Sequence, residues 1–432
     1  MAQGGAAMKA RYQEAALSMR KNEVWRNVNF EAFLKEELSL PDQAMPRRYD
    51  YQCNIPNLEA YRVAFVNGYA TMPTFATEAG VTCCSINEAR RNHADLLRQL
   101  AAQVDTDGNP YLALNADAAT DGLFLYVPDG VRLQRPVQLL SVANADTALM
   151  LHLRHVVALG RGSALTLIQC DDSHTDLAGF SNNVTLVSMD EESHLEHYKM
   201  QNLNDSTALL NQTFVTMRQG AELRSVGVTL NGGSIRNHNV VTMLGEHCNT
   251  EVHGLYLIDR EQRCDNYVYV DHACPNCNSR ELYKGILDDA AHGSFNGHVL
   301  VREGAVKTEA YQSNKNLLLT DKAFVQTKPF LEIYNDDVKC SHGSTIGQLD
   351  EQALFYIQQR GISLRNARTL LMYAFCDEVL QSIGIAALRE RLADMVKKRL
   401  HGELTACSEC ALSCANTCGC TPPDFNIDPT KL

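Results

Sequence analysis

The stretch Asn183-Val-Thr-Leu-Val-Ser-Met-Asp-Glu-Glu-Ser-His194 decides the fold, because it joins a run of β-forming residues to a tight polar turn. Similar turns recur about 27 to 30 residues apart, and two further turns halve that period. The six turns begin at Leu159, Met189, Met217, Leu244, Leu287 and Val301. A fixed period of this size predicts a solenoid, in which no single coil buries its apolar face alone.

Between residues 111 and 338 the chain is a series of short runs rich in Val, Leu, Thr and Ile, which predict strands. Such runs include 164–168, 183–187, 226–230, 240–244, 267–270, 298–301 and 316–319. We therefore expect a mainly β protein with a right-handed parallel β-helix, or a related flattened β-solenoid, as its core. A β-sandwich is the alternative, because strand spacing alone does not separate the two folds. The recurring turn favours the solenoid.

Both ends of the chain have helical patterns. At the start, helices are expected over Met8 to Lys21, Trp25 to Leu38 and Ser85 to Val104. At the end, they are expected over Asp350 to Gln359, Leu364 to Ile383 and Ile385 to Leu404, where they would cap the open last coil. The predicted parts are a mostly helical N-terminal domain (1–110), a β-helix core (111–345), a C-terminal helical domain (346–405) and a Cys-rich tail (406–432).

Composition excludes several classes of protein. The net charge of -12, with scattered Lys and Arg, disfavours nucleic-acid binding. No window approaches the run of about 18 apolar residues that a membrane span requires, so we expect a cytoplasmic protein that does not bind membranes. The fifteen cysteines are then expected to be thiols.

No enzyme class is indicated. The chain has no Gly-Lys dipeptide, which excludes a Walker A loop. The pairs Asp171-Asp172, Asp288-Asp289 and Asp336-Asp337 are interpreted as turn formers rather than as the acid and base of a glycan hydrolase.

The segment Val338-Lys-Cys-Ser-His342 carries the main functional signal. If it is a strand, Cys340 and His342 lie two residues apart on one face, roughly 6 to 7 Å apart along the chain. They could bind one metal or contact one partner. Alternatively, Cys340 could be packed as a small apolar residue and His342 could simply lie in a turn beside it.

Two other groups of cysteines are weaker metal candidates. His272, Cys274 and Cys277 are three possible ligands that lie close in sequence, without a second pair nearby. The tail holds five thiols that could bind zinc or an iron–sulfur cluster, or could have no ligand at all: Cys407, Cys410, Cys414, Cys418 and Cys420.

Long ordered strings resemble the SufB/SufD family of iron–sulfur cluster assembly proteins. They are Asn335 to Asp350 with its Cys-Ser-His-Gly motif, Leu354-Phe-Tyr with Arg360-Gly-Ile, Val270-Asp-His, Ser279 to Leu287, and Ala310 to Leu319. The motif and the length are similar to the SufD branch of that family. The resemblance covers roughly Val226 to Ile383 and is weak in the N-terminal part.

The resemblance implies a non-catalytic scaffold that pairs with SufB and docks the ATPase SufC, with a homodimer as another possible state. His342 matches the family's functional histidine, and Cys340 is the accompanying thiol where a transient cluster or iron is handled with SufB. A reduced flavin is expected only in the complex. The implied SufC-docking residues are Arg360, Gly361, Ile362, Leu364, Ala367, Leu370, Leu371 and Phe375. The alternative function is a stand-alone metal or cluster carrier that uses the tail.

Overall fold

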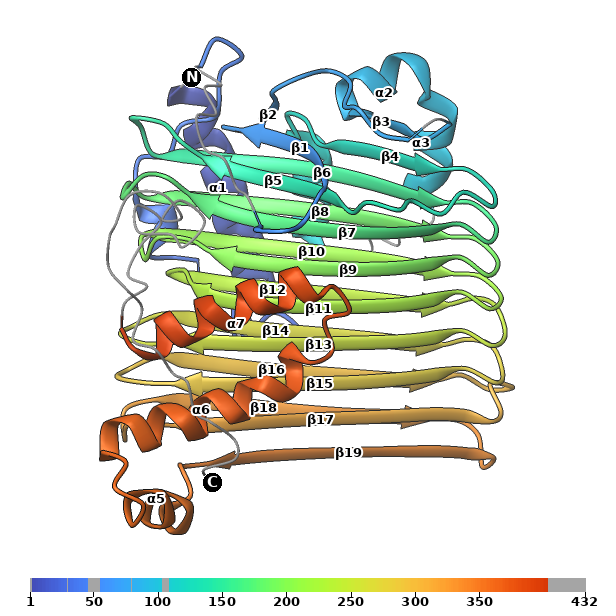
Figure 1. Cartoon of the computed structure of the whole chain (residues 1–432). Helices are drawn as coiled ribbons and strands as arrows, with labels where there is room; N and C mark the ends of the chain where they lie inside the picture. The colour runs from blue at the N-terminus through green and yellow to red at the C-terminus, as the bar shows by residue number, and fades with distance from the viewer. Residues whose placement is uncertain (1, 29, 46–54, 79, 103–108, 403–432) are drawn as a thin grey trace.

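Two sheets of parallel strands form the core of the computed structural model, which describes residues 2–28, 30–45, 55–78, 80–102 and 109–402. From β4 (Leu123–Val127) onward each coil adds one strand to each sheet, so neighbouring strands of a sheet are two apart in the chain, whereas the three strands before β4, at the N-terminal edges, do not follow this rule (Figure 1). The predicted β-solenoid is confirmed. The β-sandwich alternative is wrong, because the long strands pair in parallel along the whole stack.

The two sheets have ten and nine strands. In order from the C-terminal edge, the first holds β19 (Val338–Gly347), β17 (Thr308–Leu318), β15 (Asn278–Leu287), β13 (Asn249–Ile258), β11 (Glu222–Asn231), β9 (His194–Asn202), β7 (Ala164–Ser173), β5 (Val137–Ala143), β1 (Tyr61–Val66) and β2 (Tyr69–Ala70). The second holds β18 (Phe324–Ile333), β16 (His292–Val301), β14 (Arg263–His272), β12 (Ser234–Met243), β10 (Thr207–Met217), β8 (Gly179–Met189), β6 (Leu149–Leu159), β4 (Leu123–Val127) and β3 (Thr82–Ser85). Because β1 pairs in parallel with β5, the solenoid begins well before the predicted boundary at residue 111.

Five of the six recurring turns stack on one another along one edge of the solenoid, whereas the turn at Leu287 joins β15 to β16 at the opposite edge. Each contains a residue in the left-handed region, such as Gly162 (φ 64), Glu192 (φ 55) or Gly220 (φ 67). The N–H of that residue donates to the turn of the following coil, as Gly220 does to the carbonyl of Glu246 at 2.8 Å. The sequence repeat therefore reflects a repeated backbone conformation and its hydrogen bond.

The interior is aliphatic near this edge and polar further along the strands. An asparagine ladder occupies one position in four successive coils of the nine-stranded sheet: Asn183, Asn211, Asn237 and Asn266. From the opposite sheet, Lys199 donates to Asn239 at 2.6 Å and Gln201 donates to Asn237 at 2.7 Å. Hydrogen bonds across the gap thus satisfy side chains that would be costly to bury alone.

Two of the three C-terminal helices, the second and the third, cover the outer face of the ten-stranded sheet. The three helices are α5 (Glu351–Gln358), α6 (Leu364–Leu380) and α7 (Ala386–Leu400), and Asp350 and Ser363 cap the first two. Figure 1 shows α6 and α7 lying across the strands, where Cys376, Val379 and Leu388 join one apolar cluster with the outward residues of the sheet. The prediction that the C-terminal helices cap the last coil is wrong for α6 and α7, because their apolar stripes are buried against the sheet face, whereas α5 has no buried residue.

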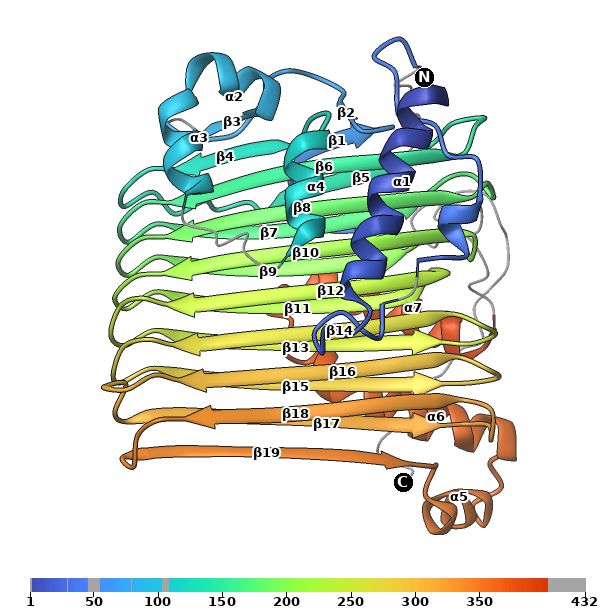
Figure 2. The same cartoon turned by 180° about the vertical axis from the view of Figure 1, so that it is seen from behind.

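The N-terminal elements cover the opposite sheet (Figure 2). They are α1 (Ala2–Met19), α2 (Ile86–Asn92), α3 (Ala94–Ala101), α4 (Pro110–Ala118) and a 3-10 turn at Phe33–Lys35. The helix predicted over Trp25 to Leu38 is wrong, since turns there place Trp25 against Tyr111 and His238. No helix among the described residues is long and apolar enough to cross a bilayer.

Arg236 links the N-terminal segment to the solenoid. Its side chain is 1 % exposed, pairs with Asp265 and donates to the carbonyl of Val24 at 2.8 Å. The guanidinium lies 4.8 Å from the Trp25 ring centre and 5.1 Å from that of Tyr267. A buried cation is thus held between a carboxylate and two aromatic faces.

We expect Arg236→Ala to destabilise the docked N-terminal segment by about 3–5 kcal/mol, because Asp265 would keep a buried charge without its partner. Trp25 is the single tryptophan of the chain, so its fluorescence during urea unfolding reports this segment directly. Arg161→Ala is the control, because its pair with Glu191 is exposed and contributes at most about 1 kcal/mol. Equal urea midpoints for the two variants would contradict the proposal that Arg236 stabilises the docked N-terminal segment.

Candidate functional site at the open end of the solenoid

Strand β19 is the last rung of the ten-stranded sheet and, in the part of the chain that the structure describes, pairs with β17 on one side only. Cys340 lies opposite Ala310, and His342 lies opposite Gln312. Ala310 and Gln312 are buried inward residues, so the alternation of a strand places Cys340 and His342 together on the inner face. The strand predicted over Val338 to His342 is confirmed. With no described rung beyond it, Cys340 stays half-buried and His342 exposed.

A buried amide and a buried carboxyl lie beneath His342. Gln312 donates its Nε2 to Oε2 of Glu281 at 2.8 Å, and Glu281 occupies the same position one coil further in. The Oε1 atoms of both side chains are buried and have no hydrogen-bond partner. The sequence analysis missed both residues, although Glu281, Gln312 and His342 recur with the spacing of the coils.

Strand β18 forms the other side of the open end. Ser344 and Thr327 are joined by a hydrogen bond of 2.7 Å between their hydroxyls, which links β19 to β18 across the interior. Large apolar side chains are exposed along the two strands and the turn between them, at Phe324, Phe330, Ile333, Tyr334 and Ile346. Exposed backbone and apolar groups together are typical of an edge that pairs with another chain.

Burial alters the protonation of two groups at this end. It raises the pKa of Glu281 to about 8, so this carboxyl is largely neutral at pH 7. Burial also raises the pKa of the Cys340 thiol, against the opposing effect of a backbone hydrogen bond with Ala310. Metal binding by Cys340 would therefore require the loss of its proton.

The second predicted group of metal candidates comprises His272, Cys274 and Cys277, and the structure brings only some of these side chains together. His272 and Cys277 are buried, Cys274 is half-buried, and the structure adds Cys248, which the sequence analysis did not single out. Cys248 and Cys277 precede register partners in neighbouring coils. Nowhere in the described ranges are three His, Cys, Asp or Glu side chains grouped so that they could hold a metal ion. The tail candidates Cys407, Cys410, Cys414, Cys418 and Cys420 lie outside the described residues.

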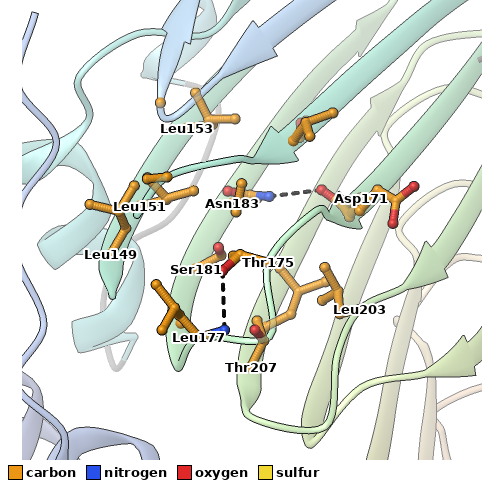
Figure 3. Close-up of a pocket in the computed structure, with 18 of the residues that line it drawn as sticks. Leu149, Leu151, Leu153, Asp171, Thr175, Leu177, Ser181, Asn183, Leu203 and Thr207 are labelled. Atoms are coloured by element: carbon orange, nitrogen blue, oxygen red, sulfur yellow. Dashed lines mark hydrogen bonds between the residues drawn. The ribbon is translucent and has the colours of Figure 1, made fainter. Parts of the chain in front are cut away.

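The Asp171-Asp172 pair lies at the end of β7 and is buried, so its interpretation as a turn is wrong. Asp171 points inward and accepts a hydrogen bond from Asn183 at 2.9 Å (Figure 3). It accepts another from Asn211 at 3.1 Å. Burial raises its pKa to about 6. The adjacent cavity of ≈ 30 Å³ has room for water but not for a substrate.

Comparison with known families identifies the chain. Residues 141–375 match the SufBD core domain of SUF system FeS cluster assembly, and residues 2–139 match the SufBD protein N-terminal region. The chain belongs to the SufBD family. It is 30 % identical to the iron–sulfur cluster assembly protein SufD of Escherichia coli, over 89 % of this chain and 90 % of that protein.

Other SufBD relatives agree. The SufD protein of Bacillus subtilis is 26 % identical over 75 % of each chain, and a SufBD family protein of Synechocystis is 30 % identical over 80 % of this chain and 79 % of its own length. These relatives are named as cluster assembly proteins. The predicted SufD-type assignment is thereby confirmed.

The residues that the SufBD resemblance assigned to ATPase docking differ in exposure. Arg360, Gly361 and Leu364 are exposed, whereas Ile362, Leu370, Leu371 and Phe375 are half-buried. Ala367 is fully buried by the packing of α6, and its assignment to docking stays a prediction. The sequence analysis missed Phe355 and Tyr356, which are 63 % and 59 % exposed on α5.

We expect Glu281→Gln to flatten the dependence of melting temperature on pH. Because the folded carboxyl keeps its proton up to a pKa of about 8, stability of the parent chain falls as pH rises from about 4.5 through about 8. Calorimetric melting across this window checks the effect. Glu309→Gln, on the same sheet and paired at the surface with Lys339, is the control. A variant that loses stability with pH as steeply as the parent would contradict the assignment.

Proposed function

We propose that this SufBD-family chain is a non-catalytic scaffold subunit, which pairs with a SufB-type subunit and docks a SufC-type ATPase while iron–sulfur clusters are built. Support comes from its SUF system family domain and from relatives named as assembly proteins. The observation that carries the proposal is the open end of the solenoid, where Cys340 and His342 share the inner face of a strand that, among the described residues, is paired along one edge only.

The pairing surface would be the edge formed by β18 and β19. The free backbone groups of β19 could hydrogen-bond to a strand of a second solenoid, and Phe330, Ile333 and Ile346 could be buried at the seam. A SufB-type partner is favoured over a second copy of this chain, because pairing of a SufD-type chain with SufB is what the family resemblance implies. A homodimer is the competing state.

At that seam Cys340 and His342 would contribute a thiolate and an imidazole to iron or to a forming cluster, which are the substrate here. Two ligands are fewer than the four that tetrahedral sulfur-rich sites use, so the partner would supply the others. The inner face also brings Gln312 and Glu281 beneath His342. Binding of a reduced flavin by the complex stays a prediction.

His342→Ala is expected to leave the fold and the complex intact and to lower the iron and acid-labile sulfide content of the complex several-fold, because an exposed ligand is lost without disturbing packing. Metal analysis and visible absorption of the co-purified complex measure this. His194→Ala is the control. His194 lies away from the open end and pairs with Glu222, so this variant should retain the iron and sulfide content of the parent complex. Unchanged iron in His342→Ala would count against the proposed role.

The ATPase would dock on the corner between α5 and α6, formed by Phe355, Tyr356, Arg360 and Leu364. The guanidinium of Arg360 lies 3.6 Å from the ring centre of Tyr356, which holds both side chains in an exposed stack. Exposed aromatic and Arg side chains are the residues that most often dominate binding energy at protein interfaces.

Tyr356→Ala is expected to weaken ATPase binding by at least tenfold, because it removes an aromatic anchor and frees Arg360. Titration of the full chain with the purified ATPase measures the affinity. The control is Leu17→Ala on α1, a large apolar side chain that is 66 % exposed on the opposite side of the solenoid. Equal affinities for both variants would place the docking surface elsewhere.

A further inference from the structure

A groove follows the edge of the solenoid at which strands of the ten-stranded sheet lead into strands of the nine-stranded sheet. It consists of two cavities of ≈ 260 Å³ and ≈ 630 Å³, which share two lining residues. The N-terminal segment forms one wall, and the first residues of β14, β16 and β18 form the other. We call it the arginine groove, and its main lining residues are Arg26, Val28, Gln262, Arg263, His292 and Phe324.

The unpaired charge that lines the arginine groove is mostly positive. Among the described residues, neither the guanidinium of Arg26 nor that of Arg263 takes part in a hydrogen bond or a salt bridge. Two lining carboxylates, Asp205 and Asp265, are each paired with another arginine. The remaining one, Glu261, is exposed. In a chain of net charge -12, this groove would attract an acidic group.

The groove also offers aromatic surface. The Phe324 side chain is 53 % exposed, and its ring centre lies 5.7 Å from that of His292. Burial and the charge of Arg263 lower the pKa of His292, so its ring is neutral at pH 7 and adds contact area without charge. Aromatic surface beside free guanidinium groups suits a peptide that carries acidic and aromatic side chains.

The last described helix ends beside this groove. Arg399, near the end of α7, donates to both carboxylate oxygens of Asp259 at 2.6 and 2.8 Å and to Oε1 of Gln262 at 3.3 Å. Gln262 lines the groove and donates to Asp205 at 2.7 Å. Figure 1 shows α7 ending at the edge where the strands of the ten-stranded sheet end. The chain beyond Gly402 therefore starts next to the groove.

The segment Thr421-Pro-Pro-Asp-Phe-Asn-Ile-Asp-Pro429 has the complementary chemistry. Its two aspartates flank an aromatic and an aliphatic residue, and its three prolines favour an extended backbone. Asp424 follows Gly402 by 22 residues, which span up to about 70 Å when extended. The segment can therefore reach any part of the groove.

We propose that residues 421–429 dock in the arginine groove of the same chain. Their two carboxylates would pair with Arg26 and Arg263. Phe425 would lie against the exposed Phe324 ring. A tether of this length gives an effective concentration on the order of millimolar, so a weak contact is enough. The tail cysteines would then lie in a closed loop between α7 and the groove. This docking involves one chain and does not depend on the scaffold function proposed above.

Hydrogen exchange followed by mass spectrometry tests the docking in the isolated full-length chain under reducing conditions. The groove variant combines Arg26→Glu with Arg263→Glu, and the tail variant combines Asp424→Arg with Asp428→Arg. A third variant carries all four changes. Exchange is compared in peptides that cover the N-terminal wall of the groove and residues 421–429, and circular dichroism melting verifies that each variant is folded.

In the parent chain both peptides are expected to exchange several-fold more slowly than in the groove variant or the tail variant, because each variant places like charges together. The variant with all four changes should regain most of the protection, since it restores opposite charges. The control combines Glu403→Arg with Glu409→Arg, which reverses two charges of the tail outside the docking segment and should match the parent.

Four results would overturn the proposal. Two of them are unprotected exchange of residues 421–429 in the parent chain and equal protection in all variants. Protection that rises with protein concentration would assign the segment to the groove of a second copy, which excludes docking within one chain. Protection of the groove that persists in the tail variant and is lost after exhaustive desalting would assign the groove to a small anion instead.

Discussion

Hydrogen bonding between the backbones of successive coils is the constraint on which the rest of this structure depends. Every strand of the solenoid has two edges, and inside the stack both are satisfied by the coils before and after it. The last rung cannot be satisfied in this way among the described residues. The feature that makes the fold stable therefore also produces an unfinished edge at β19, and the chemically distinctive pair Cys340 and His342 lies on that edge.

The same stacking explains why functional side chains occur in columns. A residue that points inward lies over the inward residue of the previous coil, so Glu281, Gln312 and His342 form one column that ends at the open edge. Cys248 and Cys277 meet for the same reason at the turn edge. Sequence separations of about one period are thus short distances in space, which is how a solenoid builds a site from distant segments.

The helices at the two ends of the chain pack on different surfaces from the one that their sequence pattern suggested. The apolar stripe of α6 and α7 predicts a buried face but does not say what buries it. In the structure these helices cover the ten-stranded sheet, while the N-terminal segment covers the other sheet through Trp25 and Arg236. Helices thus pack on both outer faces, while apolar side chains stay exposed along the edge formed by β18 and β19.

The periodic pattern of the chain was enough to favour a parallel solenoid over a sandwich and to predict most of its strands and turns, because a periodic backbone leaves a periodic pattern in the residues that fill it. The sequence also determined that Cys340 and His342 share a face, since alternation along one strand is a local property. The folded structure was needed to show which surface α6 and α7 cover, that Trp25 lies in a turn, and that Cys248 and Cys277 share the carbonyl of Gly245 as an acceptor. Those outcomes depend on packing between segments far apart in the chain, which no local pattern of residues records.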